Sequence, residues 1–298
     1  MCQQTQIDTV LPYFERWMAS FPSFSTLAAA PEETVLNHWA GLGYYARARN
    51  LHKLAKAIAA LDELPTTAKE WIKLPGIGPY TASAICSIQF GENVAVVDGN
   101  VIRVLSRLYG LETLFPNAQS AAKAVQPLAD TFLNRAKPGD HNQAMMELGA
   151  LVCTKHKPAC LLCPAKRHCR ALQKGIASDV PCIARKSTVK RTVHRIWAVR
   201  DGAIALAKQP AGSRRLAHLH ELPLWSETEG PKGAQLIARK KRGISNQIIE
   251  EHIWEFDHEA TALDQTEGEI TWQQINKLTE IPLSGPHQRW INELLEVV

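Results

Sequence analysis

Four cysteines within seventeen residues place the strongest constraint on how this chain can fold. Cys153, Cys160, Cys163 and Cys169 follow the spacing C-x6-C-x2-C-x5-C, with no other cysteine between them. They offer four thiolates to a single soft metal centre. Zinc sites usually bring two close cysteine pairs, or a pair with paired histidines, whereas all-thiolate ligation also suits an iron–sulfur cluster. The spacing therefore indicates a metal and leaves both zinc and iron–sulfur open.

The same segment is strongly basic. Residues 153–170 contain five lysines and arginines and no acidic residue. The net charge of the whole chain is only +5, so this local clustering is more informative than the total. A metal site surrounded by positive charge points to nucleic acid. Two further acid-free basic runs, at residues 185–195 and 239–242, are as typical of a solvated surface as of DNA contact.

Length and composition set the outer limits. A chain of 298 residues with 45% hydrophobic and 21% charged residues is typical of two globular domains. No apolar run of about twenty residues exists, which excludes a membrane span. Residues 1–6 lack the positive and apolar regions of a signal peptide, so we expect a cytosolic protein. Cysteines stay reduced there, and clustered ones serve as ligands rather than disulfides.

Hydrophobic periodicity divides the chain in two. From residue 7 to about 172 apolar residues recur at helical spacing between glycine and proline breakers, which predicts six or more short helices. Asp201-Gly202 between two apolar runs predicts a β-hairpin, residues 247–249 and 252–256 predict strands, and residues 288–297 predict a closing helix. We expect a multidomain α and α+β protein, with a helical domain at 1–172, a basic linker at 173–192 and a smaller α/β domain at 193–298.

Three motifs in the helical part suit work on DNA. Residues 74–82 place two glycines before a helix start, which favours phosphate binding but is equally typical of a plain turn. Asp98 stands just before a helix, where an acid alone indicates an N-cap. Residues 41–50 place two tyrosines between a glycine turn and two arginines, which suits stacking on bases, although buried tyrosines are nearly as common in this position.

Together these motifs resemble a family. With residues 3–6 (Gln-Gln-Thr-Gln), residues 142–149 and the four cysteines, all in family order, the chain resembles the adenine DNA glycosylases of the helix-hairpin-helix (endonuclease III) superfamily over residues 3–169. These base-excision repair enzymes remove adenine mispaired with 8-oxoguanine. The resemblance implies an all-α glycosylase domain and a [4Fe-4S] cluster on the four cysteines. Its DNA partner would be a duplex with 8-oxoguanine:adenine or guanine:adenine mispairs, bound by a monomer of the bacterial cytosol and nucleoid.

The resemblance also assigns roles to residues. Adenine inside a duplex cannot be reached, so the enzyme must extrude it. Asp98 would stabilise the cationic sugar, helped by Asn100 and Tyr80. A lysine in place of Tyr80 marks the bifunctional relatives, and a tyrosine cannot form a Schiff base, so a monofunctional enzyme follows. Gln3, Gln4, Thr5, Leu42 and Tyr44 would wedge into the duplex, and further DNA contacts are expected from Gly43, Arg47, Leu74, Gly76, Gly78, Lys155 and Arg167.

One catalytic group of the family has no counterpart in the printed chain. The departing adenine must be protonated by a second acid, much as glycosidases use two carboxyl groups. In the family this acid is a glutamate shortly before Gln-Gln-Thr-Gln, a position that falls two residues before Met1. Either the natural protein begins upstream, which we favour, or the chain is a shortened paralogue that binds mispairs without cutting. We expect the 298 residues alone to bind mispaired DNA and to be inactive or severely impaired in excision.

The C-terminal part resembles the Nudix-like module that such glycosylases use to recognise 8-oxoguanine. The chain lacks the run Arg-Glu-x-x-Glu-Glu that binds Mg²⁺ in pyrophosphate hydrolysis, so recognition rather than hydrolysis is implied. Residues 243–246 stand where the family has a loop such as Phe-Ser-His that contacts the oxidised base. Ser245 matches this loop and Asn246 departs from it. A polar turn leading into a strand is nearly as typical of these residues.

Overall fold

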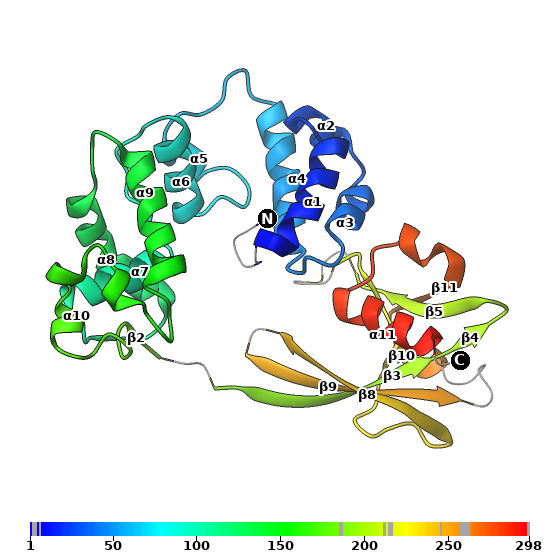
Figure 1. The fold of residues 1–298 in the computed structure, drawn as a ribbon. Coiled ribbons are helices and arrows are strands. Elements are labelled where there is room, and N and C mark those ends of the chain that lie inside the picture. The colour runs from blue at the N-terminus through cyan, green and yellow to red at the C-terminus, as the bar shows by residue number, and fades with distance from the viewer. Residues whose placement is uncertain are drawn as a thin grey trace. The chain divides into compact units, whose positions relative to one another are not determined.

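The computed structural model describes residues 1, 5, 7–184, 187–210, 213, 217–244, 246–256 and 263–296. The chain packs into two compact units: the first contains residues 1–60 and 187–298, and the second contains residues 61–186 (Figure 1). Across the described residues, no helix combines the length and the apolar character that crossing a membrane requires. This division differs from the one expected from the sequence, because residues 1–60 pack with the C-terminal part. The domain boundaries at residues 172 and 192 stay a prediction.

Four helices form the N-terminal part of the first unit. They are α1 (Ile7–Ser20), α2 (Phe24–Ala29), α3 (Glu32–Trp39) and α4 (Ala46–Ala59). Ser23 and Thr26 form a reciprocal capping box at the start of α2, directly after Pro22. Trp17 and Trp39 meet edge to face, with ring centroids 5.5 Å apart, in the apolar core of these helices. The helical periodicity of the sequence is thus confirmed here.

Two sheets form the C-terminal part of the first unit. In the larger one the strand order is β10-β7-β3-β9-β8, with β3 (Val189–Trp197) parallel to β9 (Gln247–Phe256) and β8 (Ala234–Ile244) antiparallel to β9. The smaller one has the order β11-β5-β4, with β6 paired to β5. The remaining strands are β4 (Val199–Arg200), β5 (Ala203–Lys208), β6 (His220–Glu221), β7 (Leu224–Trp225), β10 (Thr266–Glu267) and β11 (Glu269–Gln274).

The predicted hairpin at Asp201-Gly202 is confirmed. Strands β4 and β5 pair antiparallel on either side of it, and both turn residues have positive φ, 49° and 70°. Such backbone angles match the right-handed twist of the flanking strands. The closing helix, α11 (Gly285–Leu295), begins three residues earlier than predicted. It packs Trp290 and Ile291 against Ile204 of β5 and Ile253 of β9, so the core of this part lies between the two sheets and α11.

The second unit is almost wholly helical. Its elements are α5 (Ala68–Trp71), α6 (Pro79–Gln89), α7 (Gly99–Tyr109), α8 (Ala118–Phe132), α9 (Pro138–Glu147), the π-helical turn η1 (Leu148–Val152), the 3-10 turns η2 (Cys160–Leu162) and η3 (Lys166–His168), and α10 (Arg170–Gln173). One face of α7 packs Val101 and Leu105 against α8 and α9. The predicted α and α+β fold class is therefore confirmed. A short parallel bridge between β1 (Leu114–Phe115) and β2 (Cys182–Ile183) has no signal in the hydrophobic pattern.

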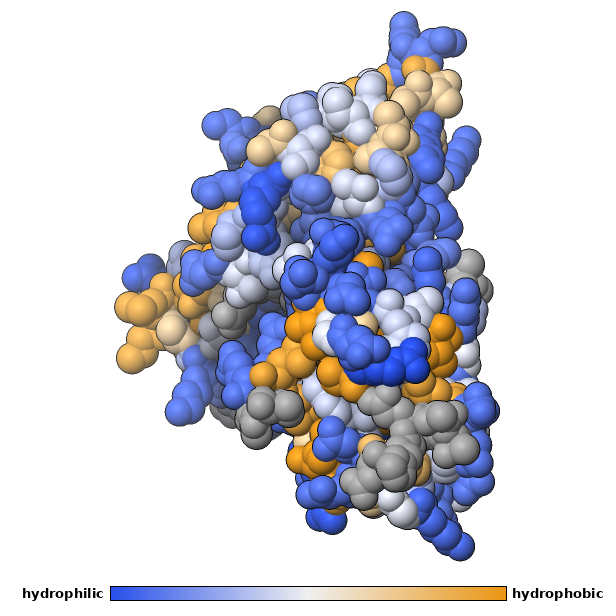
Figure 2. All heavy atoms as spheres, turned by 90° about the vertical axis from the view of Figure 1, so that its right-hand side faces the viewer, coloured by the Kyte–Doolittle hydropathy of each residue, from blue (hydrophilic) through white to orange (hydrophobic). Residues whose placement is uncertain are grey.

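The outer surface agrees with these cores. On the face drawn in Figure 2, hydrophilic residues predominate and hydrophobic residues gather in smaller patches between them. The largest fully buried side chains, such as Trp39, Leu105 and Ile253, lie inside the helical and sheet cores. Packing within each unit accounts for these buried residues, whereas Leu11, Phe14 and Met18 of α1 are exposed.

Candidate active site

Asp98 stands at the N-terminus of α7 and is half-buried. One carboxylate oxygen accepts a hydrogen bond from the backbone N–H of Val101 at 2.7 Å, and the other accepts from the Asn100 side-chain amide at 3.0 Å. Asp98 is therefore a true helix N-cap, as its position alone indicates. The two donors also fix the orientation of the carboxylate, which is what a catalytic role requires.

Tyr80 lies close to this carboxylate. It belongs to the first turn of α6, and its hydroxyl donates to the sulfur of Met146 at 3.7 Å. Burial raises the pKa of Tyr80, and the negative charge of Asp98 raises it further. Tyr80 is thus a neutral hydrogen-bond donor at physiological pH. The structure brings Asp98, Asn100 and Tyr80 together in one unit, as the sequence predicts.

Asn142 fixes the segment that leads into Asp98. Its side chain is 2% exposed. It accepts from the backbone N–H of Val96 at 3.0 Å and donates to the carbonyl of Val94 and the hydroxyl of Ser87, both at 2.9 Å. Because Asn142 is buried, these bonds hold the backbone of residues 94–96 in place. The motif at 142–149 thus supports the backbone segment that leads into Asp98.

Arg103 ties the site to the cysteine loop, a contact that the sequence reasoning missed. It donates to the side-chain oxygen of Asn100 at 2.8 Å, to the carbonyl of Gly149 at 2.6 Å and to the carbonyl of Cys153 at 2.7 Å. A continuous series of hydrogen bonds therefore runs from Asp98 through Asn100 and Arg103 to Cys153. The available signal was a basic residue one turn after Asn100, between apolar residues of α7.

The glycine at position 149 allows this close packing. A Cβ atom there would lie 2.5 Å from the Cβ of Asn100, which is far inside van der Waals contact. Only glycine therefore lets the π-helical turn η1 approach α7 so closely. Single π-helical turns are frequent at functional sites, and this one begins the segment that ends in the first cysteine.

The four cysteines line one hollow, together with Arg107 and Pro158. Arg107 is 2% exposed and donates to the Cys153 sulfur at 3.2 Å and to the carbonyl of Thr154 at 2.8 Å. Among the described residues no carboxylate forms an ion pair with it. A buried cation requires a partner charge, and ionised cysteine thiolates would supply one. Burial raises the pKa of Cys160, and its neighbouring cysteines raise it further.

The thiols of the four cysteines lie around this hollow. Within the described ranges, no three His, Cys, Asp or Glu side chains converge closely enough to hold a single ion. Four thiolates are the ligands of zinc sites and of cubane iron–sulfur clusters alike. The choice between these two metals stays a prediction.

The predicted DNA-backbone residues of the second unit lie on turns. The turn between α5 and α6 contains Leu74 and Gly76, whose φ is 74°, and Gly78 caps α6 without a side-chain hydrogen bond. A Cβ atom at Gly78 would meet nothing within 4 Å, so the space before this helix is open. Lys155 and Arg167 are exposed on the cysteine loop. Their phosphate contacts stay predictions.

Four of the predicted duplex-facing residues cluster in the first unit. Tyr44 is 64% exposed and has a φ of 50°, which is uncommon for a residue with a side chain. The Arg47 guanidinium lies 5.4 Å from the centre of the Tyr44 ring and donates to the Thr5 hydroxyl at 3.3 Å and to the Gly43 carbonyl at 3.5 Å. These contacts gather Thr5, Gly43, Tyr44 and Arg47 around one exposed aromatic ring.

Leu42 behaves differently from its neighbours. Its side chain is 6% exposed and packs in the helical core with Trp39. A core role therefore fits Leu42 better than the predicted wedge role, because a wedge must leave the core to enter DNA. Gln3 and Gln4, also predicted to wedge, lie outside the described residues.

Asn246, one of the two predicted lesion contacts, lies between β8 and β9. Ser245 is outside the described residues, and the Asn246 side chain donates to the carbonyl of Ser187 at 3.0 Å. Asn246 thus holds the start of β3 in this structure, and its contact with a base stays a prediction. Strand alternation splits the basic run beside it: Arg239 and Lys241 are exposed, whereas Arg242 pairs with Glu221 at 2.5 Å.

Comparisons with known proteins agree with this geometry. Residues 1–129 match the model of the HhH-GPD superfamily base excision DNA repair proteins. The human adenine DNA glycosylase is 45% identical over 316 residues, which cover 99% of this chain and 54% of that protein. Over residues 1–129 the chain is therefore similar to the HhH-GPD superfamily. The Schizosaccharomyces pombe adenine DNA glycosylase is 40% identical over 61% of this chain and 42% of its own length.

Solved structures of glycosylases have a fold similar to part of this chain. A thermostable thymine-DNA glycosylase has a TM-score of 0.50 and 26% identity, covering 58% of this chain and 80% of its own. An endonuclease III bound non-covalently to DNA has a TM-score of 0.50 and 24% identity, covering 59% of this chain and 81% of its own, and shows the fold alone. The chain spans about half the length of the human relative.

Proposed function

We propose that this protein is a monofunctional base-excision repair glycosylase that removes adenine paired with 8-oxoguanine or guanine. The observation that carries the proposal is the placement of Asp98 beside Asn100 and Tyr80 at the start of α7. Its relatives named adenine DNA glycosylase support the choice of base.

The chemistry follows from the cationic character of the reacting sugar. Breaking an N-glycosidic bond leaves positive charge on the sugar, which a fixed carboxylate stabilises. Asp98 has no ion-pair partner among the described residues, and its two hydrogen-bond donors hold it in place. Tyr80 supplies a neutral hydroxyl and no amine. The sugar would therefore be hydrolysed without a Schiff base.

We propose a [4Fe-4S] cluster as the resident group of Cys153, Cys160, Cys163 and Cys169. The hollow that these thiols line and the buried Arg107 cation beside them support this choice. When bound, the cluster would join both ends of the loop and thereby fix the positions of Lys155 and Arg167. Those two exposed cations would then contact phosphates without reading the bases.

Recognition would be divided between two turns of the first unit. Tyr44, supported by Arg47 and Thr5, would insert beside the mispair, with Gln3 and Gln4 as further contacts from the resemblance. Ser245 and Asn246 would contact the oxidised base. In the second unit Leu74, Gly76 and Gly78 would hold the backbone of the DNA.

The test uses two polypeptides, because the 298 residues contain no acid that matches the general acid of the family. One is the chain as printed, and the other carries the family's Ser-Glu segment ahead of it. Both should bind a duplex with one 8-oxoguanine:adenine pair more tightly than the same duplex with thymine:adenine. Only the extended polypeptide should release adenine readily. Equal binding of both duplexes by both polypeptides would contradict the proposed function. Rapid release of adenine by the printed chain would show that another acid of the chain protonates the base.

A further inference from the structure

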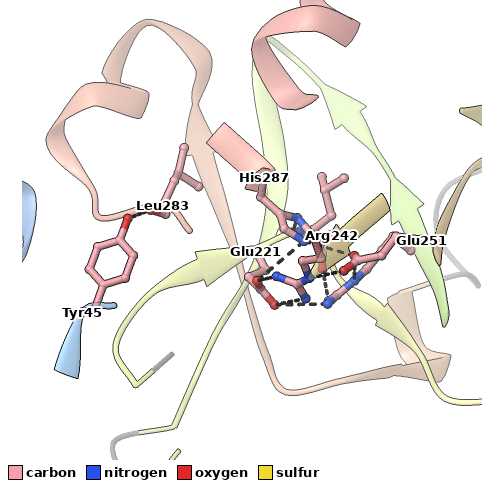
Figure 3. A network of polar contacts seen from close by, with 8 residues as sticks. Tyr45, Glu221, Arg242, Glu251, Leu283 and His287 are labelled. Carbon is pink, nitrogen blue, oxygen red and sulfur yellow. Dashed lines mark hydrogen bonds and ion pairs between the residues drawn. The ribbon is translucent and has the colours of Figure 1, made fainter. Parts of the chain in front are cut away.

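Tyr45 connects parts of the chain that are far apart in sequence. It stands directly before α4 and is 3% exposed. Its hydroxyl donates at 2.9 Å to the carbonyl of Leu283, 238 residues away, and accepts from the backbone N–H of Gly41 at 3.5 Å (Figure 3). Burial raises the pKa of Tyr45 to about 12, so the hydroxyl remains a donor at any physiological pH.

The segment around Leu283 is bonded in turn to β6. The backbone N–H of His220 donates to the carbonyl of Pro282 at 2.8 Å, and the N–H of Ser284 donates to the carbonyl of His220 at 3.1 Å. Leu283 itself is buried in the sheet core. These paired backbone bonds leave little freedom between Leu283 and β6, whose next residue is Glu221.

Glu221 belongs to a buried network of charges. It pairs with Arg242 at 2.5 Å and with Arg195 at 3.1 Å. Glu251 pairs with Arg195 at 2.8 Å, with Arg242 and with His287 at 3.2 Å. Figure 3 shows Glu221, Arg242, Glu251 and His287 pointing toward one another. Two carboxylates balance two guanidiniums, and removing one would leave a buried charge unpaired, so the network resists rearrangement.

The two ends of this arrangement lie next to the two recognition turns. Arg242 pairs with Ile249 across the β8–β9 ladder, and this ladder ends beside Asn246. At the other end, Tyr45 follows the exposed Tyr44, whose backbone has the unusual φ of 50°. Ladder pairs, ion pairs and hydrogen bonds within the first unit therefore connect the strand ends next to the predicted lesion contact with the residue next to the predicted wedge.

We infer that Tyr45 is a positioning residue through which the lesion-reading turn and the Tyr44 wedge are coupled. This inference rests on the proposed function. A base seated against the β8–β9 turn contacts the end of β8, and the rigid contacts of Arg242 with Glu221 and of Tyr45 with Leu283 hold Tyr44 in the position that suits the same base. Coupling is reciprocal, so insertion of Tyr44 in turn strengthens contact with the oxidised base.

The experiment compares the loss of the Tyr45 hydroxyl with the loss of a matched hydrogen-bond donor elsewhere in the first unit. Tyr45→Phe deletes the donor to Leu283. The control, Asn37→Ala, deletes a side-chain donor to the carbonyl of Glu280 at 2.9 Å, which joins the same helical and C-terminal parts but does not adjoin Tyr44. For each variant, dissociation constants are measured for two duplexes, one with an 8-oxoguanine:adenine pair and one with a guanine:adenine pair. In parallel duplexes 2-aminopurine replaces the adenine, and its fluorescence emission reports unstacking.

Tyr45→Phe should lower the preference for 8-oxoguanine by roughly fivefold or more, the lower bound of typical coupling between sites. Its affinity for undamaged duplex should stay within about twofold, since phosphate contacts are untouched. The control should leave the preference unchanged. An unchanged preference in Tyr45→Phe, or an equal loss in the control, would overturn the inference and reduce Tyr45 to a packing contact.

A double-mutant cycle keeps the inference testable if Tyr45→Phe does not fold. In the parent chain the effects of Tyr44→Ala and Ser245→Ala on binding should be non-additive, because the two turns act together. Additive effects would refute the coupling. Failure of the proposed function has a different signature, since the parent chain itself would then show no preference for the mispaired duplex.

Discussion

The two regions that bury arginine balance its charge in different ways. In the first unit Arg195 and Arg242 face Glu221 and Glu251, so the buried charges cancel within the polypeptide. In the second unit Arg107 donates to carbonyl groups and to the sulfur of Cys153, with no carboxylate beside it among the described residues. The buried charges of the recognition region therefore cancel within the polypeptide. The charge of Arg107 in the cysteine region would be balanced by ionised thiolates, as a bound cluster would provide.

The largest expected effect separates cutting from recognition. Asp98→Asn in the extended polypeptide should slow adenine release by roughly a hundredfold or more, in line with the loss of an electrostatic group at a reacting centre. The preference for 8-oxoguanine should persist, because the first unit is unchanged. Single-turnover release and equilibrium binding measure the two. Asp130→Asn, on an exposed turn of α8, is the matched control, and an unchanged rate in Asp98→Asn would leave it a helix cap only.

Removal of the proposed cluster should affect the two units unequally. Oxidative loss of iron would leave Arg107 buried without a partner charge, so the second unit should lose protection from protease near residues 153–169 and unfold at lower denaturant. Tryptophan emission should report a stable first unit throughout, since seven of the eight tryptophans lie there. Equal destabilisation of both units would contradict the comparison.

Acid, in contrast, should destabilise the first unit more than the second. Burial alone opposes ionisation of Glu251, but the hydrogen bond from His287 and the charges of Arg195 and Arg242 lower its pKa to about 2. A lowered folded-state pKa contributes stability above the unfolded value, near 4.5, and that stability is lost as pH falls toward 2. The unfolding free energy of the first unit should therefore fall across this range.

Glu251→Gln tests the acid effect directly. The variant should be less stable than the parent at pH 7 by about 3–5 kcal/mol, the usual result of breaking a buried ion pair, and its stability should vary less between pH 4.5 and 2. Glu250→Gln changes the neighbouring residue of β9, a partly exposed position paired with Lys241, and should have a much smaller effect. Similar losses in both variants would show that the buried network is no more important than a surface pair.

The smallest expected effect concerns the exposed cations of the cysteine loop. Replacing Lys155 and Arg167 by Ala should weaken binding to mispaired and paired duplexes alike and reduce the salt slope by about one per contact removed. Lys174→Ala is the control, because that lysine already pairs with Glu112 at 2.6 Å. Loss of affinity for only one mispair would contradict a phosphate role.

The sequence predicted the second region better than the first for a physical reason. Asp98, Asn100 and Tyr80 lie within motifs of a few residues, so local spacing sufficed to place them on α6 and α7. Arg103 escaped notice because its partners, Gly149 and Cys153, come from a turn some fifty residues later. A side chain's partners across the fold leave no mark in local periodicity.

In the first region almost every informative contact is of long range. The hairpin at Asp201-Gly202 was predictable from its turn residues. The bond from Tyr45 to Leu283 joins residues 238 positions apart, and the pair of Glu221 with Arg242 joins two strands 21 residues apart. For the same reason the sequence did not show that Leu42 is buried in the helical core, and the wedge role that the resemblance gives it stays a prediction.

The most direct test of the central claim is the identity of the products. The extended polypeptide is incubated with a duplex that contains one 8-oxoguanine:adenine pair, and the released base and the DNA are analysed separately. We predict free adenine and an abasic strand that stays intact until alkali is added, because Tyr80 offers no amine to cleave it. Release of 8-oxoguanine, or strand cleavage before alkali with a borohydride-trapped covalent complex, would contradict the account.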